Sequence, residues 1–351
     1  MTVQKPWVRF CTAWGTSLAI IIVLLILNPI MPKIIRPDQF NIIMLAGINI
    51  ILALSLNLIN GITGQFSIGH AGFMAIGAYT SAVFTKYFFI DQLNGPAGGF
   101  YFLIALLLGG VAASVAGILV GLPSLRLRGD YLAIATLGFG EIIRVVLFNV
   151  DKIGDRIELG GATSFKAIPL ITDFFWVYTI AFLTIKLFVN LMKSSHGRAL
   201  VSIREDELAS ELMGVDTTYY KVLGFVVGAF FAGVAGGLFA HYFGLLNPAK
   251  FNFMLSVEVI VMVVLGGMGS LSGSIMAAII LTILPEWLRN LTPVLASFVK
   301  PVMPTFGEAL AKTDLRMIVY SLILIILMLT RPKGLFGHEE LSWSKIKKWF
   351  P

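Results

Sequence analysis

The sequence predicts an all-α membrane protein with about ten transmembrane helices, some of them broken. Of its 351 residues, 57% are hydrophobic and only 13% are charged, and the mean hydropathy is +0.89. A soluble domain carries about 25% charged residues. The apolar residues form continuous runs, whereas a membrane β-barrel requires an alternating pattern. Because these runs fill most of the chain, we expect a single transmembrane domain, 1–351, and no sizeable soluble domain.

The uncharged runs are long enough to cross a bilayer, which needs about 20 apolar residues per helix. We place the spans at 12–32, 40–60, 66–90, 101–122, 131–149, 172–192, 222–246, 254–268, 273–290 and 314–330. Lys5 and Arg9 precede the first run as in a signal peptide. However, the uncharged stretch Phe10–Pro32 has 23 residues and no A-x-A cleavage site follows it. We therefore expect an uncleaved first span.

An even number of spans puts both ends of the chain on one side of the membrane. The loop 193–221 and the tail 331–351 are rich in Lys and Arg, so the positive-inside rule makes that side cytoplasmic. The charge bias is modest, since Lys33 and Arg36 oppose it. We expect a multi-pass protein with cytoplasmic N- and C-termini, and we attribute the net charge of +7 to this topology rather than to nucleic-acid binding.

The loop 193–221, KSSHGRALVSIREDELASELMGVDTTYYK, is long and mixed in charge. Apolar positions recur in it at helical spacing, namely Ile203, Leu208, Leu212 and Met213. Gly214 then supplies a stop signal, so we predict a short amphipathic helix at about 204–213. Its polar face holds Glu205, Asp206, Glu207 and Glu211. Anionic lipid would repel this face, so we expect a protein partner rather than an interfacial helix lying on lipid.

The stretch Gly61–Tyr79, GITGQFSIGHAGFMAIGAY, is rich in glycine and lies in a run, Gln39–Thr85, that has no Asp, Glu, Lys or Arg. A phosphate-binding loop is excluded, because the chain has no G-x-x-x-x-G-K-[ST] motif. Two compatible interpretations remain: close packing of helices through small residues, or a broken helix whose backbone lines a polar passage. The candidate pathway residues at the break are Thr63, Gln65, Ser67 and His70.

The glycine pattern recurs later in the chain. Gly61, Gly64 and Ser67 match Gly266, Gly269 and Ser272 at a constant offset of 205 residues. Internal repeats are common in transporters. The predicted topology makes the two copies parallel, whereas an inverted repeat needs opposite orientations. Either the match is accidental or the predicted number of spans is off by one.

Two charged residues within the span 131–149, Glu141 and Arg144, are three positions apart and can pair on one helix face. Ionisable groups within a membrane are costly and therefore suggest a function, which makes the two residues candidates for the translocation pathway. The alternative is a structural ion pair near the membrane interface. Glu258 is a similar case. The chain has one cysteine, Cys11, and four scattered histidines, which give no metal-site spacing. We find no catalytic triad or paired-carboxylate motif, and expect no enzyme activity, cofactor or metal in this chain.

Several segments together resemble permeases of the branched-chain amino acid ABC importers, and in particular the longer, M-type subunit of the two that pair. The segments are GITGQFSIGHAGFMAIGAY, GDYLAIATLGFGEIIRVVL, GRALVSIREDELASELMGVD, VMVVLGGMGSLSGSIMAAII and RPKGLFG. They follow the family's order from about residue 40 to 337. The resemblance implies a permease of the bacterial cytoplasmic (inner) membrane that carries Leu, Ile or Val.

The resemblance also implies partners in addition to membrane lipid. These are a second permease subunit, two cytoplasmic ATPase subunits that bind ATP and Mg²⁺, and an extracytoplasmic binding protein. The loop 193–221 is similar to the family's coupling element, which fits a groove of the ATPase. The implied coupling residues are Arg204, Glu205, Asp206, Glu207, Leu208, Glu211, Leu212 and Gly214.

Two departures from the family pattern affect what the resemblance implies. The signature E-A-A-x-x-x-G is here ELASELMG, and the family's T-G-G-P-x-G is here LGGATSF, which includes Gly160–Phe165. Relatives that carry urea or short amides therefore remain an alternative, as do other amino acids. A third alternative is an ion-coupled secondary transporter, with Glu141 or Glu258 as its coupling carboxylate. A structural scaffold is disfavoured by the many helix breaks.

Overall fold

The computed structural model describes residues 6–299, apart from 94, 96, 125–128, 155 and 156, together with 322, 325, 326, 329, 330 and 334. Among these residues the only strands form a short antiparallel hairpin, β1 (Lys152–Ile153) with β2 (Ile157–Glu158). Seven of the described helices are long and apolar enough to cross a membrane. The structure therefore confirms an all-α membrane protein.

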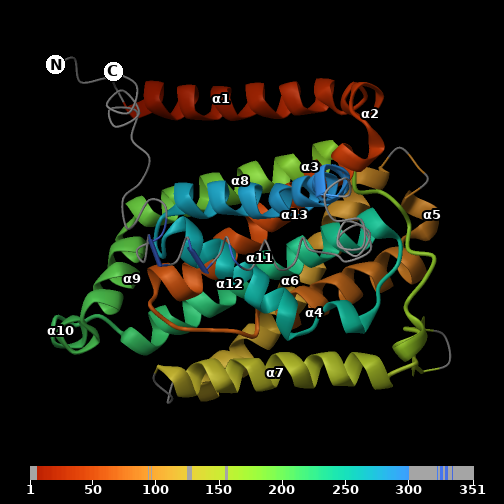
Figure 1. Ribbon diagram of the computed structural model, residues 1–351. Helices are drawn as coiled ribbons and strands as arrows, with labels where there is room; N and C mark the ends of the chain where they lie inside the picture. The colour runs from red at the N-terminus through yellow and green to blue at the C-terminus, as the bar shows by residue number, and fades with distance from the viewer. Residues whose placement is uncertain are drawn as a thin grey trace, which may run out of the picture.

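The seven spans are formed by α3 (Pro37–Asn57), α6 (Gly98–Ser124), α7 (Asp130–Asn149), α8 (Phe174–Lys193), α11 (Thr217–Phe243), α12 (Phe253–Gly266) and α13 (Leu271–Val299). The other described helices are α1 (Pro6–Leu27), α2 (Met31–Ile34), α4 (His70–Val83), α5 (Ile90–Leu93), α9 (Ser195–Glu205) and α10 (Glu207–Leu212). Single π turns, η1 (Leu58–Ile62) and η2 (Phe84–Phe88), extend α3 and α4, and 3₁₀ turns form at η3 (Gly161–Thr163) and η4 (Pro248–Lys250). Figure 1 shows α1 along one flank of the bundle, α7 along the opposite flank, and α9 and α10 at one end.

Glycines bring α4 and α11 into close contact in the middle of the bundle. A Cβ atom added at Gly77 would lie 2.2 Å from the backbone of Gly233, and one added at Gly236 would lie 2.0 Å from the carbonyl oxygen of Met74. Only glycine permits helix backbones to approach this closely. The close-packing interpretation is thus confirmed for the helical half of the glycine-rich stretch.

The seven spans found among the described residues are fewer than the ten predicted. The predicted span 66–90 is a 14-residue helix, α4, followed by a π turn, because residues 63–69 are non-helical and Gly64 has a φ of +71°. The predicted first span corresponds to α1, in which Ser17–Leu27 is a shorter apolar helix that does not count among the seven. Most of the predicted span 314–330 lies outside the described residues.

The two ends of the bundle differ. Near α9, the chain leaves α3 and α12 through glycine-rich turns. At the opposite end, the loop 150–173 packs over the ends of α4 and α11: Lys86 Nζ donates a hydrogen bond to the carbonyl oxygen of Lys166 (2.8 Å), and Phe165 pairs with Leu246. Phe165 is 1% exposed, so the segment LGGATSF ends in a buried anchor.

The amphipathic helix predicted at 204–213 is instead two helices, α9 and α10. Asp206 between them has extended backbone angles (φ −154°, ψ 109°), and its Oδ1 accepts a hydrogen bond from the Ala209 amide (3.0 Å). This N-cap interaction begins a new helix and ends the previous one. Gly214, with a φ of +85°, follows the end of α10 as predicted.

Candidate functional site

The two glycine-rich turns that match in sequence lie in direct contact near α9. A Cβ atom on Gly61 would lie 2.3 Å from the backbone nitrogen of Gly269. Three glycines of these turns, Gly64, Gly267 and Gly269, have φ values of +71°, +104° and +90°, which residues with a side chain rarely adopt. The repeated pattern therefore marks two turns that touch each other at one end of the bundle.

Two buried asparagines on α3 and η1 hold these turns. Asn57 Oδ1 accepts a hydrogen bond from the Gly269 amide (2.8 Å), and its Nδ2 donates to the carbonyl oxygen of Ser270 (3.0 Å). Asn60 exchanges two hydrogen bonds with the backbone of Ser67, both of 3.1 Å. Buried backbone groups in turns need such partners. Neither asparagine is predicted from the sequence, although two side-chain amides three positions apart in an uncharged run are a usable signal.

Two more segments reach the same place. Arg204, near the end of α9, donates from Nη1 to the carbonyl oxygen of Gly61 (3.0 Å). Gly334, from the motif RPKGLFG, is buried against Gly267, where an added Cβ atom would lie 2.6 Å from the Gly267 backbone. We call this meeting point of Asn57–Gly64, Arg204, Gly267–Ser270 and Gly334 the glycine junction.

The four predicted pathway residues at the break are buried, each at most 4% exposed. Thr63 Oγ1 donates to the carbonyl oxygen of Ile59 (2.5 Å), and His70 Nε2 lies 2.8 Å from Ser55 Oγ. The side-chain amide of Gln65, the Ser67 hydroxyl and His70 Nδ1 have no hydrogen-bond partner among the described residues. Leaving a buried polar group unpaired costs about 1–3 kcal/mol. Such groups are expected to pair with water or solute, or in another conformation.

The fifth predicted residue, Glu141, comes from a different segment of the chain than the other four. It is on α7 and lines a narrow pocket together with Ile68, Ala71, Gly72, Gly140, Asn252 and Ser256. Two hydroxyls hold the start of α4 beside this pocket: Thr136 Oγ1 accepts from the Ile68 amide and Ser256 Oγ accepts from the Ala71 amide, both at 3.0 Å. The pocket is thus formed where α4, α7 and α12 meet.

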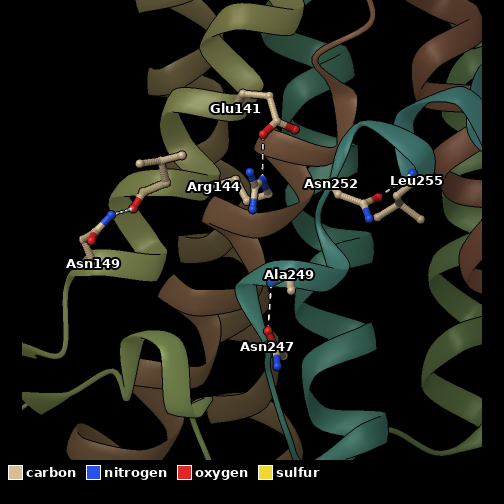
Figure 2. Close-up of polar contacts among 8 residues, drawn as sticks. Glu141, Arg144, Asn149, Asn247, Ala249, Asn252 and Leu255 are labelled. Atoms are coloured by element: carbon tan, nitrogen blue, oxygen red, sulfur yellow. Dashed lines mark hydrogen bonds and ion pairs between the residues drawn. The ribbon is translucent and has the colours of Figure 1, made fainter.

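Glu141 and Arg144 form the predicted ion pair, with 2.7 Å between Oε2 and Nε. Figure 2 shows the pair on the side of α7 that faces the start of α12. There, the side chains of Asn247 and Asn252 accept hydrogen bonds from the amides of Ala249 (2.8 Å) and Leu255 (3.2 Å). Both charged side chains are about one-third exposed, so they border the pocket rather than lying sealed in the core.

The residues of α9 and α10 divide into buried and exposed groups, which corrects the single apolar face that was predicted. Ile203 is 4% exposed and packs into the bundle. The other three apolar residues are exposed at the tip of the loop: Leu208 (63%), Leu212 (89%) and Met213 (84%). Glu207 forms an ion pair with Lys221 (2.6 Å), and Arg204 forms one with Glu205 (2.5 Å).

A bundle of long apolar helices defines a multi-pass membrane protein, and helices interrupted near buried polar groups are a feature of many transporters. The chain belongs to the family described as "Branched-chain amino acid transport system / permease component", whose model matches residues 39–328. The chain is therefore a transmembrane permease of this family, and the resemblance drawn from the sequence is confirmed.

Three relatives illustrate the similarity. The chain is 34% identical to the high-affinity branched-chain amino acid transport system permease protein LivM of Escherichia coli K12, over 90% of this chain and 74% of the relative. It is 35% identical to LivM of Salmonella typhimurium, over 78% of this chain but only 64% of the relative's length. LivH of E. coli K12 is 28% identical over 59% of each chain. No solved protein structure gives a significant match.

Proposed function

We propose that this chain is one of two permease subunits of an ATP-driven importer for Leu, Ile and Val. The family match carries this proposal, because the relatives LivM and LivH are both named as permeases of branched-chain amino acid transport. In this proposal the partners are a second, different permease, two ATPase subunits that bind ATP and Mg²⁺, and an extracytoplasmic binding protein. The chain forms one transmembrane domain of about ten spans in the bacterial inner membrane.

The end of the bundle with α9 and α10 is the cytoplasmic end in this proposal, and α10 docks on an ATPase subunit. The exposed side chains of Leu208, Leu212 and Met213 support this assignment. Large apolar residues gathered at the tip of a charged loop are typical of a protein-binding site. The proposal keeps the topology expected from the sequence, with the N- and C-termini also on the cytoplasmic side.

The translocation path in this proposal runs along the non-helical break and the pocket beside Glu141. The unpaired polar atoms of Gln65, Ser67 and His70 support the first part of this path, and the partly exposed Glu141–Arg144 pair supports the second. ATP-driven movement of the partners switches the helices between outward-open and inward-open states, so binding free energy rather than chemistry in this chain drives transport.

The docking proposal is tested with the full transporter reconstituted in liposomes. Leu212→Glu puts an unpaired charge into the proposed interface, and we expect ATPase binding to weaken by at least about tenfold. The matched control is Leu170→Glu, another strongly exposed leucine (72%, against 89% for Leu212) at the opposite end of the bundle, which is expected to leave ATPase binding unchanged. Unchanged ATPase binding and uptake in Leu212→Glu would contradict the docking site.

The main alternatives have their own tests. Uptake of solute by this chain alone, driven by a sodium or proton gradient, would favour an ion-coupled secondary transporter. Binding measurements with the cognate binding protein separate Leu, Ile and Val from urea, short amides and other amino acids. Tight binding of urea or an amide, with no binding of Leu, Ile or Val, would overturn the proposed substrate.

A further inference from the structure

The side chain of Arg204 is directed into the bundle, toward the glycine junction. Its guanidinium is shared between two acceptors on different parts of the molecule. Nη1 donates to the carbonyl oxygen of Gly61 in the bundle, whereas Nη2 and Nε bind the carboxylate of Glu205 in the loop (2.5 and 3.1 Å). The side chain is 23% exposed, so most of it is enclosed by the bundle.

Both glycine turns are shaped around this side chain. A Cβ atom at Gly64 would lie 3.0 Å from Arg204 Cγ, and one at Gly269 would lie 2.5 Å from Arg204 Nη1. Any larger residue at either position would therefore crowd the arginine as well as strain a backbone with positive φ. The two turns leave space for one extended side chain between them.

The turns that Arg204 contacts are themselves joined. Asn57, one helical turn before Gly61, binds the amide of Gly269 and the carbonyl of Ser270. A displacement of Arg204 therefore acts on the end of α3 and, through Asn57, on the turn between α12 and α13. These helices form part of the bundle that must rearrange during transport.

The helix that bears Arg204, α9, packs firmly against the bundle, so Arg204 moves when α9 moves. Leu200 and Ile203 are 1% and 4% exposed, and Gly197 packs so closely on the end of α8 that a Cβ atom would lie 2.2 Å from the carbonyl oxygen of Leu191. The break at Asp206 then separates α9 from the exposed α10. Arg204 thus lies between the docking tip and the helices of the bundle.

We propose that Arg204 is a positioning residue that transmits movement of the α9–α10 loop to the glycine junction, and so couples events at the docking tip to the ends of α3 and α12. This inference rests on the proposed function, because it assumes that an ATPase docks on α10. It differs from the role implied by the family resemblance, in which Arg204 belongs to the ATPase-binding loop itself.

The test uses the complete transporter with both permeases, the ATPases and the binding protein. Arg204→Met removes the guanidinium but keeps an unbranched side chain. We expect uptake per ATP hydrolysed to fall about tenfold, while ATPase binding and ATP hydrolysis stay near the wild-type values. The matched control is Arg198→Met on the same helix, whose guanidinium donates to the nearby carbonyl of Lys193 (3.2 Å), and this variant should keep the wild-type ratio.

Three results would overturn the inference: an unchanged ratio in Arg204→Met, loss of ATPase binding in that variant, or an equal fall in Arg198→Met. If Arg204→Met does not assemble, Arg204→Lys carries the test, because its single ammonium cannot reproduce the two-sided contact of the guanidinium. A lowered ratio in the lysine variant supports the inference and an unchanged ratio overturns it. Failure of the wild-type complex to hydrolyse ATP during uptake would instead reject the proposed function.

Discussion

Arg204 and Arg144 each bind an oxygen acceptor within hydrogen-bond distance, but they connect very different parts of the molecule. Arg204 binds Gly61, which is 143 positions away in the sequence. Arg144 binds Glu141, three positions away on the same helix. An ion pair within one helix moves with that helix, whereas a contact between distant segments depends on how those segments are placed. The glycine junction is therefore sensitive to relative movement, and the α7 pair is not.

The largest expected effect comes from filling the contact between the two turns. In Gly61→Val the new Cβ atom would lie 1.9 Å from Asn57 Oδ1 and 2.3 Å from the Gly269 nitrogen. Because a backbone atom cannot move aside cheaply, we expect the free energy of unfolding to fall by about 3 kcal/mol or more. Thermal unfolding in detergent measures this change.

The control for the contact between the two turns is a glycine on α7, the helix that bears the Glu141–Arg144 pair. Gly138 has no atom within 4 Å of an added Cβ atom, so Gly138→Val should leave the unfolding temperature nearly unchanged. If Gly61→Val and Gly138→Val destabilise the protein equally, the glycine junction is not packed more tightly than α7. Loss of uptake in Gly138→Val without loss of stability would mark this face of α7 as a contact with the second permease.

An intermediate effect is expected from removing the amide that joins the turns. Asn57→Leu leaves the Gly269 amide without its acceptor, which costs about 1–3 kcal/mol; the Ser270 carbonyl still accepts from Ser274. The control is Asn149→Leu, since Asn149 on α7 donates to Val145 within its own helix (2.8 Å) and is exposed. Denaturation of both variants is compared. If Asn57→Leu lowers the free energy of unfolding by less than Asn149→Leu does, the bridging role of Asn57 is contradicted.

The smallest effect belongs to the α7 pair itself. Glu141→Gln removes a partly exposed ion pair within one helix, so we expect the free energy of unfolding to change by less than about 1 kcal/mol. A double-mutant cycle with Arg144→Gln measures the interaction free energy of the two side chains. A value well above that limit would mean that Arg144 is desolvated more than its exposure indicates. Any loss of uptake at unchanged stability would place the pair on the translocation path.

The sequence predicts those helices whose apolar run or stop signal lies within the helix or directly beside it. The span expected at 131–149 is α7, Asp130–Asn149, and the stop signal of Gly214 ends α10. The break at Asp206 was readable as an N-cap, but the apolar spacing across it suggested one helix. The inward direction of Arg204 and the bridge made by Asn57 could not be read in this way, because both contacts join residues far apart in sequence and leave no local periodicity.

The hydrogen bond between Asn57 and Gly269 spans 212 positions. On a ribosome that adds about 5–20 residues per second, roughly 10–40 s separate the synthesis of the two residues. During that interval the side-chain amide of Asn57 must find water, another helix or the insertion machinery, because hydrocarbon offers it no acceptor. The native hydrogen bonds of the Asn57 side chain form only after the turn that carries Gly269 has been synthesised, which makes the order of synthesis part of how this protein reaches its native state.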